Sequence, residues 1–378
     1  MSLLELLSSW YAHARSHLPK DVAVWDAHSH TGDADPDGVI GHVDELLGAL
    51  RAARHAGAVV ASNHNPAGYR QANDRILAEV AAAEGRLIPF LRVDPSDPDS
   101  VGEVERCLQA GHRGIKLHPR AEAFDLDHSN LIPIARLAAA AGAPLLFHAG
   151  RGIPSLGDGA IQLVDRVEGL NVILAHCAIS DLAYLGPIAA DHPGIFFDTS
   201  WWNVTDIIAL MSWVPPQRIV YASDTPYGHP MMSFTITMRP AAAAGYTVEH
   251  LTALFSTTLT GLVNGRRPDL TDPAPGDDFF SHTAGLLRVH SNLHGAVVRL
   301  FGRQDPSQPL SLARMACNVQ ASTGYADVYG AIARSIDAVE PHLDDPAASR
   351  EVIGLLLACT AATLTPEVGV PTELVAGA

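Results

Sequence analysis

Five short apolar segments of this chain each end in side chains that can bind a metal ion or move a proton. The segments end in Asp26-Ala27-His28-Ser29-His30, in Lys116-Leu117-His118, and at His148, His176 and Asp224. Alternate side chains of a β-strand share one face, so His28 and His30 should reach a single ion. A third nitrogen and a carboxylate from other strands would complete a mixed nitrogen and oxygen site, which zinc, manganese or iron accepts.

The segments that carry these residues belong to a regular alternation of β-rich runs and Ala/Leu-rich helical patterns. Such alternation predicts repeated βα units and a parallel sheet. The expected strands are residues 22–30, 58–64, 87–94, 114–119, 144–149, 171–176, 194–199 and 218–224. The helical stretches between them include residues 43–55, 69–84, 101–110, 131–141, 161–168 and 182–191. Several of these should end at a glycine, namely Gly57, Gly85, Gly111 and Gly142.

Eight βα units in a span of about 250 residues match a closed (β/α)8 barrel, whose reactive face lies at the C-terminal ends of the strands. All the candidate ligands fall on that face. A doubly wound open sheet would instead favour a glycine-rich phosphate turn after the first strand. Here that turn is acidic over residues 33–38, which would repel a pyrophosphate. We therefore expect an α/β fold, a TIM barrel with a C-terminal helical extension.

The pattern divides the chain into three parts. Residues 1–21 are expected to form an N-terminal helix, residues 22–265 the barrel, and residues 266–378 a helical C-terminal extension. A stretch rich in proline and aspartate begins the third part and indicates a surface linker. Helical runs follow at residues 279–301, 311–316, 325–339 and 347–364, with no strand candidates among them.

Charge and composition narrow the class of protein. The 378-residue chain carries 25 Lys and Arg against 41 Asp and Glu, a formal charge of −16. This balance argues against a nucleic-acid or anionic-membrane surface, which needs a basic stripe. The cysteines are scattered without a Cys-x-x-Cys pair, so neither a zinc cluster nor a disulfide framework is implied.

These observations also lead us to expect a cytoplasmic protein. The N-terminus reads as an amphipathic helix with Glu5 inside it, rather than as a signal peptide. We find no apolar stretch of the roughly 18 to 20 residues needed to span a bilayer.

The motifs, taken in order, resemble the amidohydrolase superfamily, and within it the metal-dependent TIM-barrel branch that also includes non-oxidative decarboxylases. The likeness covers residues 20–265 and rests on Asp26-x-His28-x-His30, Gly114-Ile115-Lys116-Leu117-His118-Pro119, Phe147-His148-Ala149-Gly150, Leu174-Ala175-His176-Cys177 and Ala222-Ser223-Asp224-Thr225-Pro226. Residues 255–260 depart from the family pattern, which puts the closing helix in question but not the metal ligands.

The resemblance implies roles for individual residues. By motif match, the metal ligands are His28, His30, His148 and Asp224. His176 corresponds to a histidine that polarises the substrate or acts as an acid or base, and in some members binds a second metal. The family's strand-four lysine is carboxylated in binuclear members, so Lys116 is a candidate metal bridge, although a single ion is favoured. Zinc is the preferred metal, with manganese or iron as alternatives.

The reaction expected from the resemblance is hydrolysis of a small organic molecule. A divalent ion lowers the pKa of its bound water to about 7 and polarises a carbonyl group. That water would attack an amide, lactam or lactone carbonyl, with Asp224 and His176 as the catalytic residues. The alternative is a non-oxidative decarboxylase that uses the same ion. A third possibility is a barrel that has lost catalysis and serves as a binding or scaffold protein.

Further residues near the strand ends are candidates for binding the substrate. Arg151, like Arg120, could pair with a substrate carboxylate. His118 shares a strand face with Lys116, and Trp201 could form the floor of an apolar pocket. The partner is therefore expected to be a small molecule, and the C-terminal extension could cover the barrel, influence substrate choice or mediate a homodimer.

Overall fold

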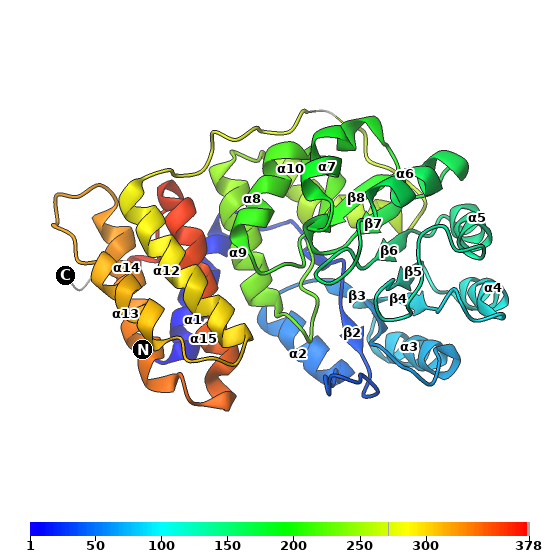
Figure 1. Ribbon diagram of the computed structural model, residues 1–378, viewed down its shortest axis with the longest axis horizontal. Coiled ribbons are helices and arrows are strands. Elements are labelled where there is room, and N and C mark those ends of the chain that lie inside the picture. Colours follow the sequence, from blue (N-terminus) through cyan, green and yellow to red (C-terminus); the bar gives the residue numbers. More distant parts are fainter. Residues whose placement is uncertain (271, 376–378) are drawn as a thin grey trace.

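Short parallel strands and helices alternate from Trp25 to Leu262 and form a nearly closed barrel (Figure 1). The computed structural model describes residues 1–270 and 272–375. The strands are hydrogen-bonded in the order β1-β3-β4-β5-β6-β7-β8-β9, all in parallel, and β2 pairs with β3. This confirms the expected fold class of a (β/α)8 barrel with C-terminal helices.

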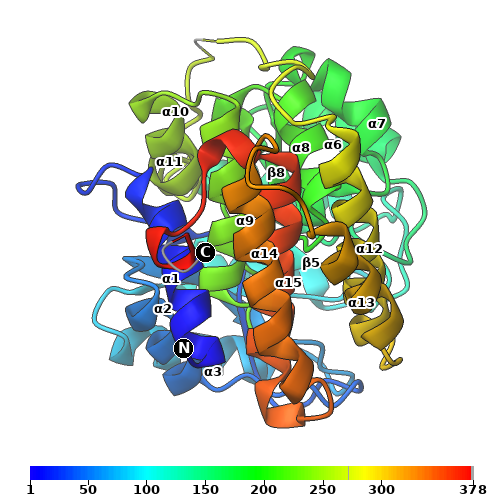
Figure 2. The ribbon, with the colours of Figure 1, turned by 90° about the vertical axis from the view of Figure 1, so that its left-hand side faces the viewer.

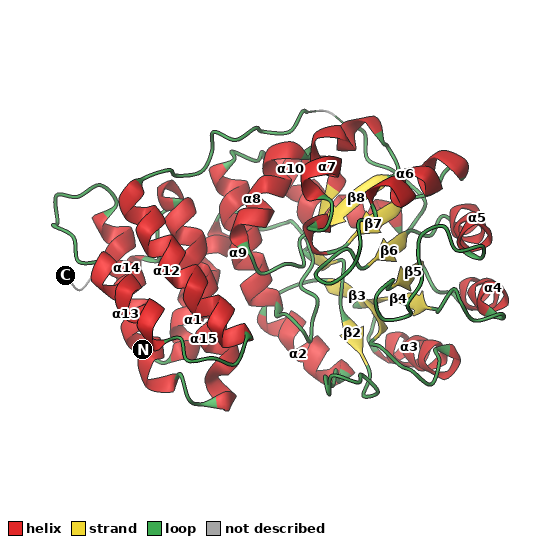
Figure 3. Cartoon of the chain, in the orientation of Figure 1, coloured by secondary structure: helices red, strands yellow, loops and turns green. Residues whose placement is uncertain are grey.

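The strands are short, and the helices cover the outer face of the sheet (Figure 3). The strands are β1 (Trp25–Asp26), β2 (His30–Thr31), β3 (Gly57–Ser62), β4 (Leu87–Arg92), β5 (Gly114–Leu117), β6 (Leu145–Phe147), β7 (Val172–Leu174), β8 (Ile195–Asp198) and β9 (Ile219–Val220). The barrel helices are α2 (Val43–Ala52), α3 (Arg70–Ala82), α4 (Ser100–Ala110), α5 (Leu131–Ala141), α6 (Gly157–Arg166), α7 (Leu182–Leu185), α8 (Val204–Trp213), α9 (Pro230–Ala243), α10 (Val248–Thr252) and α11 (Thr258–Leu262).

The first predicted strand, residues 22–30, is in fact two short strands separated by residues 27–29. The chain changes hydrogen-bond partners there: Ala27 N donates to the carbonyl of Tyr221 (2.9 Å), whereas Ala61 N donates to the carbonyl of Ser29 (3.0 Å). The carboxylate of Asp26 also accepts a hydrogen bond from His28 N (3.1 Å). His28 therefore lies outside a regular strand, and the expectation that alternation along one strand aligns it with His30 was wrong in that detail.

The same segment closes the barrel. Asp224 N donates to the carbonyl of His28 (2.8 Å), and His30 N donates to the carbonyl of Thr225 (2.7 Å). The residues that follow β9 thus lie directly beside the first strand. Because parallel strands present their C-terminal ends at one rim, the two ends of the sheet meet where the candidate ligands lie.

Period-two alternation divides the apolar side chains between the barrel interior and the helices. Leu146, Ile173 and Phe196 are paired in register and belong to one fully buried cluster with Leu259 and other residues of α11. Their sequence neighbours belong to a separate cluster that packs against the helices. Full burial of each such side chain is worth about 1.5–3 kcal/mol. This core holds the strand ends, and therefore the site, in place.

Helix ends agree with the glycine pattern in part. Gly111 and Gly142 are left-handed C-caps with φ of 114° and 64°, as expected for residues without a Cβ. Gly57 does not end a helix: it is the first residue of β3, where a Cβ would lie 2.1 Å from the Arg86 carbonyl oxygen. The closing helix, which the departure of residues 255–260 from the family pattern put in question, is present. Helix α10 continues through a π-helical turn, η4 (Ala253–Thr257), into α11.

The N-terminal helix and the C-terminal helices form one layer beside α9 (Figure 2). This layer consists of α1 (Leu3–Ser16), α12 (Ala284–Phe301), α13 (Ser307–Ala316), α14 (Ala326–Val339) and α15 (Ser349–Leu364). Buried Trp10 donates from Nε1 to Ser335 Oγ (3.2 Å), and buried Arg239 of α9 donates to the carbonyl of Thr365 (2.8 Å). Polar contacts therefore join the N-terminal helix to the C-terminal helices, and join α9 of the barrel to the segment after α15. The domain boundaries drawn from the sequence remain predictions.

One helix, Pro346–Leu364, is long and apolar enough to cross a membrane by length and composition, contrary to the expectation that no such segment exists. In the structure, 67% of its apolar window is buried against the rest of the chain. A core helix satisfies the same criterion, so this segment is weak support for a membrane span.

His55 provides a test of the packing between the barrel and α9. Its ring contacts the rings of Tyr221 and Phe234, at centroid distances of 5.4 and 5.9 Å, and these two rings also contact each other. Neither ring nitrogen has a hydrogen-bond partner in the described part of the chain. Burial lowers the pKa of His55 from 6.5 to about 3. Between these values the unfolded chain binds a proton that the folded chain does not, so folding stability falls as the pH falls.

We predict that His55→Phe raises the free energy of unfolding by about 1 kcal/mol at pH 7, because an unpaired buried polar group is removed. The advantage of the variant over the wild type should widen as the pH falls below 6.5. Chemical denaturation at pH 7.0, 6.0 and 5.0 measures this, with exposed His342→Asn as the control. A constant difference across that range would contradict the assigned pKa shift.

Candidate metal centre and its cavity

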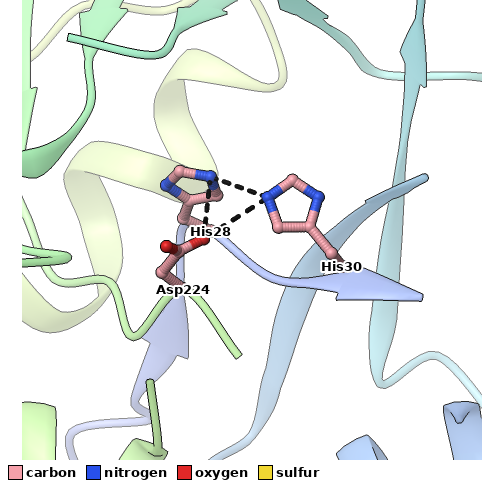
Figure 4. Close-up of side chains that lie close together, drawn as sticks. All are labelled: His28, His30 and Asp224. Atoms are coloured by element: carbon pink, nitrogen blue, oxygen red, sulfur yellow. Dashed lines mark hydrogen bonds and ion pairs between the residues drawn. The ribbon is translucent and has the colours of Figure 1, made fainter. Parts of the chain in front are cut away.

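Three side chains from opposite sides of the barrel closure meet at the centre of the site (Figure 4). Nε2 of His28 lies 3.0 Å from Nε2 of His30, and Oδ1 of Asp224 lies 3.4 Å from each of these nitrogens. His28 and His30 are buried, with 1% and 4% of their surface exposed. The expected histidine pair and Asp224, which follows β9, are therefore brought together.

The hydrogen bonds of the two imidazoles decide which atoms face the centre. Nδ1 of His28 lies 2.9 Å from Oδ2 of Asp198, and Nδ1 of His30 lies 3.2 Å from the carbonyl oxygen of Ser62. Both acceptors require a proton on Nδ1, so each Nε2 presents a lone pair. Burial, and then the charge of Lys116, hold the pKa of both imidazoles well below 6.5. Apart from Nζ of Lys116, which lies 2.7 Å from Nε2 of His28, these atoms are acceptors facing one another, and the donor set suits zinc, manganese or iron.

Sequence analysis did not assign a role to Asp198 or Ser200, yet both organise the site. Oδ1 of Asp198 accepts hydrogen bonds from the backbone nitrogens of His176 (2.8 Å) and Ser200 (2.9 Å), while its other oxygen orients His28. Asp198 ends β8, one of the strands for which no terminal candidate was proposed. Its position at the C-terminal end of a strand was the signal that could have identified it.

His148 and His176 lie beside this group and contact each other. Nε2 of His176 is 3.0 Å from Nδ1 of His148, and the His28 and His176 rings are 5.4 Å apart. Nε2 of His148 is buried and lacks a hydrogen-bond partner among the described residues. Of the histidines proposed as ligands, His148 alone is outside the group in which all ligand atoms lie within 4.8 Å of one another. Its role as a ligand remains a prediction.

His118 and Lys116 line the same cavity as the metal candidates. The His118 ring stacks on that of His148, with centroids 3.8 Å apart and an interplanar angle of 11°. Nζ of Lys116 lies 2.7 Å from Nε2 of His28, and burial lowers the pKa of this lysine to about 8. Lys116 is thus close enough to take part in metal binding, and its role as a bridge also remains a prediction.

The carboxylates of Asp224 and Asp26 contact different groups. Burial raises the pKa of Asp224 to about 6, and its carboxylate faces the histidine pair. Burial raises the pKa of Asp26 to about 7, but Asp26 accepts hydrogen bonds from the backbone of His28 and Ser223 (2.9 Å). Asp26 therefore joins the first strand to the segment after β9 rather than orienting an imidazole ring.

A buried ion pair that sequence analysis missed forms another wall. Arg92, which ends β4, donates from Nη2 to Oε1 of Glu122 (2.7 Å), and both side chains are 2% exposed. The same carboxyl group accepts a hydrogen bond from the backbone nitrogen of His118 (3.0 Å). The pair therefore fixes the loop after β5 against β4, and Arg92 lines the cavity.

Two overlapping cavities open onto the metal candidates. One, of about 430 Å³, contains His28, His30 and Lys116; the other, of about 580 Å³, contains Trp201 and Arg151. Both are lined by Arg120, His148, His176, Asp224 and Tyr227. Volumes of about 300–1,000 Å³ are typical of small-molecule sites. All three proposed substrate-binding residues, His118, Arg151 and Trp201, therefore line a cavity at the site.

Comparison with known proteins was made at two levels. A family model described as "Amidohydrolase" matches residues 18–236, more than half of the chain. The chain belongs to this amidohydrolase family. The matched segment contains every metal candidate. No curated protein sequence gives a significant match.

Several solved structures share the fold of this chain. A Staphylococcus aureus protein named as an amidohydrolase matches with 18% identity and a TM-score of 0.53, over 64% of this chain and 99% of its own. A Burkholderia multivorans amidohydrolase with bound zinc matches with 14% identity and a TM-score of 0.52, over 65% and 100%. The 5-carboxyvanillate decarboxylase of Sphingomonas paucimobilis matches with 15% identity and a TM-score of 0.50, over 64% and 99%.

The contact between Asp198 and His28 yields a prediction for metal binding. Replacing Asp198 with Asn removes the carboxylate that fixes the His28 tautomer, and such changes typically lower metal affinity about 10–100-fold. Titration of metal-depleted protein with zinc against a competing chelator measures the affinity. The control is Asp181→Asn, because Asp181 is also buried but accepts hydrogen bonds from Ser155 and Leu156. Unchanged affinity in Asp198→Asn would contradict the orienting role.

Proposed function

We propose that the protein is a metal-dependent hydrolase that cleaves an amide, lactam or lactone bond in a small organic molecule. The observation that carries this proposal is the convergence of Nε2 of His28, Nε2 of His30 and Oδ1 of Asp224, whose ligand atoms all lie within 4.8 Å of one another. Membership of the amidohydrolase family supports it. An ion bound there, most simply zinc, supplies Lewis-acid polarisation and an activated water at neutral pH.

The residues around this group have the properties that the reaction requires. Asp224 presents its carboxylate to the histidine pair and lines the cavity, so it is placed to accept a proton from a water molecule there. His176 is held by its Nδ1, 2.7 Å from the carbonyl oxygen of Ser200, so its Nε2 points toward His148 and the cavity. His176 is therefore positioned to stabilise charge on a substrate oxygen or to deliver a proton to the leaving group.

A specific observation favours decarboxylation as the second candidate. Arg120 and Arg151 line the cavity, and neither forms an ion pair with a carboxylate of residues 1–270 or 272–375. In a chain of net charge −16, unpaired cations at the site suit a substrate that carries a carboxylate. Protonation of the substrate carbon would then fall to Asp224 or His176. On sequence grounds alone, we also propose that the protein is cytoplasmic and that it forms a homodimer.

Metal dependence is tested with the full-length protein. We predict close to one equivalent of zinc, manganese or iron per chain, and a loss of metal in His30→Ala and Asp224→Ala without loss of the fold. Elemental analysis measures the metal, and circular dichroism checks the fold. Exposed His342→Ala serves as the control. Wild-type protein purified without chelators and lacking any such metal would argue against an enzyme of this class.

The two reactions are separated by their products. A panel of small lactones, amides and aromatic carboxylic acids is incubated with the metal-loaded protein and followed by mass spectrometry. Hydrolysis adds 18 mass units as water, whereas decarboxylation releases carbon dioxide, which a coupled assay detects. We expect addition of water with at least one lactone or amide, and loss of that activity in Asp224→Asn. Release of carbon dioxide alone would favour the decarboxylase instead.

A further inference from the structure

The C-terminal end of α12 lies at the edge of the metal centre. Val298, Phe301 and Gly302 line the cavity of about 580 Å³ that also contains His148, His176 and Asp224. These three residues belong to the helical extension, whereas the ligands belong to the barrel. The cavity that holds the reactive groups is thus completed by a segment far along the chain.

A row of aromatic rings connects the reactive histidines to the extension. His176 is 6.1 Å from Trp201, Trp201 is 5.7 Å from Trp202, and Trp202 is 5.1 Å from Phe301, measured between ring centroids. His294, which belongs to α12 like Phe301, also stacks on Trp202, with a centroid distance of 5.4 Å and an interplanar angle of 25°. The indole of Trp202 is therefore held between the barrel and α12, and its position depends on the extension.

Helix α12 exposes apolar side chains at this end. Its residues Leu286, Val289, Leu293 and Val297 are fully buried. In contrast, Phe301 is 44% exposed and Val298 is 47% exposed, and both line the cavity. Exposed apolar groups that gather at a concave surface commonly mark a binding site.

The barrel accounts for only part of this chain. Three of the matched structures are covered over 98–100% of their own length but cover 64–65% of this one. The family model likewise ends at residue 236, before α12 begins. The α12 wall therefore lies outside the segment that the family model matches.

We propose that Phe301 and Val298 of α12, together with Trp202, form a subsite that binds an apolar or aromatic end of the substrate, remote from the bond that reacts. This inference rests on the proposed function for the location of the reacting bond. The substrate is then an elongated small molecule: its reacting group lies among the histidines, and its apolar end lies against the extension. Phe301 and Trp202 are specificity-determining residues, because they contact the substrate without touching the reacting atoms.

The test compares ligands that differ only by a phenyl group. The probes are propionate and 3-phenylpropionate, with propionamide and 3-phenylpropionamide as an uncharged pair, and binding to the full-length protein is measured by titration calorimetry or ligand-observed NMR. We expect the phenyl member of at least one pair to bind roughly tenfold more tightly to the wild type, the lower end of what burial of an aromatic ring gives.

The ratio of the two dissociation constants is the readout for the variants. In Phe301→Ala and Trp202→Ala the ratio should fall toward one, whereas binding of the short member should change less than twofold. Trp202→Phe should recover part of the ratio, which separates a contact with the ligand from a disturbed fold. Met315→Ala is the control, because Met315 is an exposed apolar residue of α13 that does not line the cavity. Its ratio should equal that of the wild type.

Two results would overturn the subsite. One is a wild-type ratio near one in both probe pairs; the other is a ratio that Phe301→Ala and Trp202→Ala leave unchanged. Because the NMR spectrum reports any conversion of a probe directly, binding is measured before product accumulates and the ratio does not depend on turnover. Failure of the proposed function would appear instead as a wild-type protein without metal or without product, whatever the ratio.

Discussion

The site depends on one electrostatic constraint: two imidazole lone pairs and a carboxylate oxygen are held in contact with one another. Asp198 and the carbonyl of Ser62 fix the protons of His28 and His30 on the far side of each ring. Burial prevents either imidazole from gaining a second proton near neutral pH. Holding these three acceptor atoms together is unfavourable for folding, and a cation bound among them would offset that cost.

The barrel can hold the two imidazoles and the carboxylate together because they extend from a rigid rim of strand ends. Fully buried apolar layers hold the strands, and the ligands extend from the strand ends into the cavity. The ion pair of Arg92 with Glu122 and the hydrogen bonds of Asp26 fix the loops around the rim. Polar groups that do not touch the centre therefore preserve its geometry.

Much of the fold and the centre of the site could be predicted from the sequence, because strand ends are visible as apolar runs that stop at a polar residue. His28, His30 and Asp224 were identified in this way. Asp198 was missed because its partner, His28, lies 170 positions away, so its place at a strand end did not reveal which residue it contacts. The split of the first strand was missed for a similar reason, since it follows from hydrogen bonds to Tyr221 and Thr225. The wall formed by Phe301 depends on how a whole layer of helices packs, which no local pattern of residues specifies.

The metal candidates stand on both sides of the line where the sheet closes. His28 and His30 belong to its first edge, and Asp224 follows its last strand, with backbone hydrogen bonds running between them. An ion held by all three side chains is therefore also a crosslink between the two margins of the sheet. Backbone hydrogen bonds keep the cylinder closed without the ion, and loss of the ion should raise local opening along this line while the rest of the fold persists.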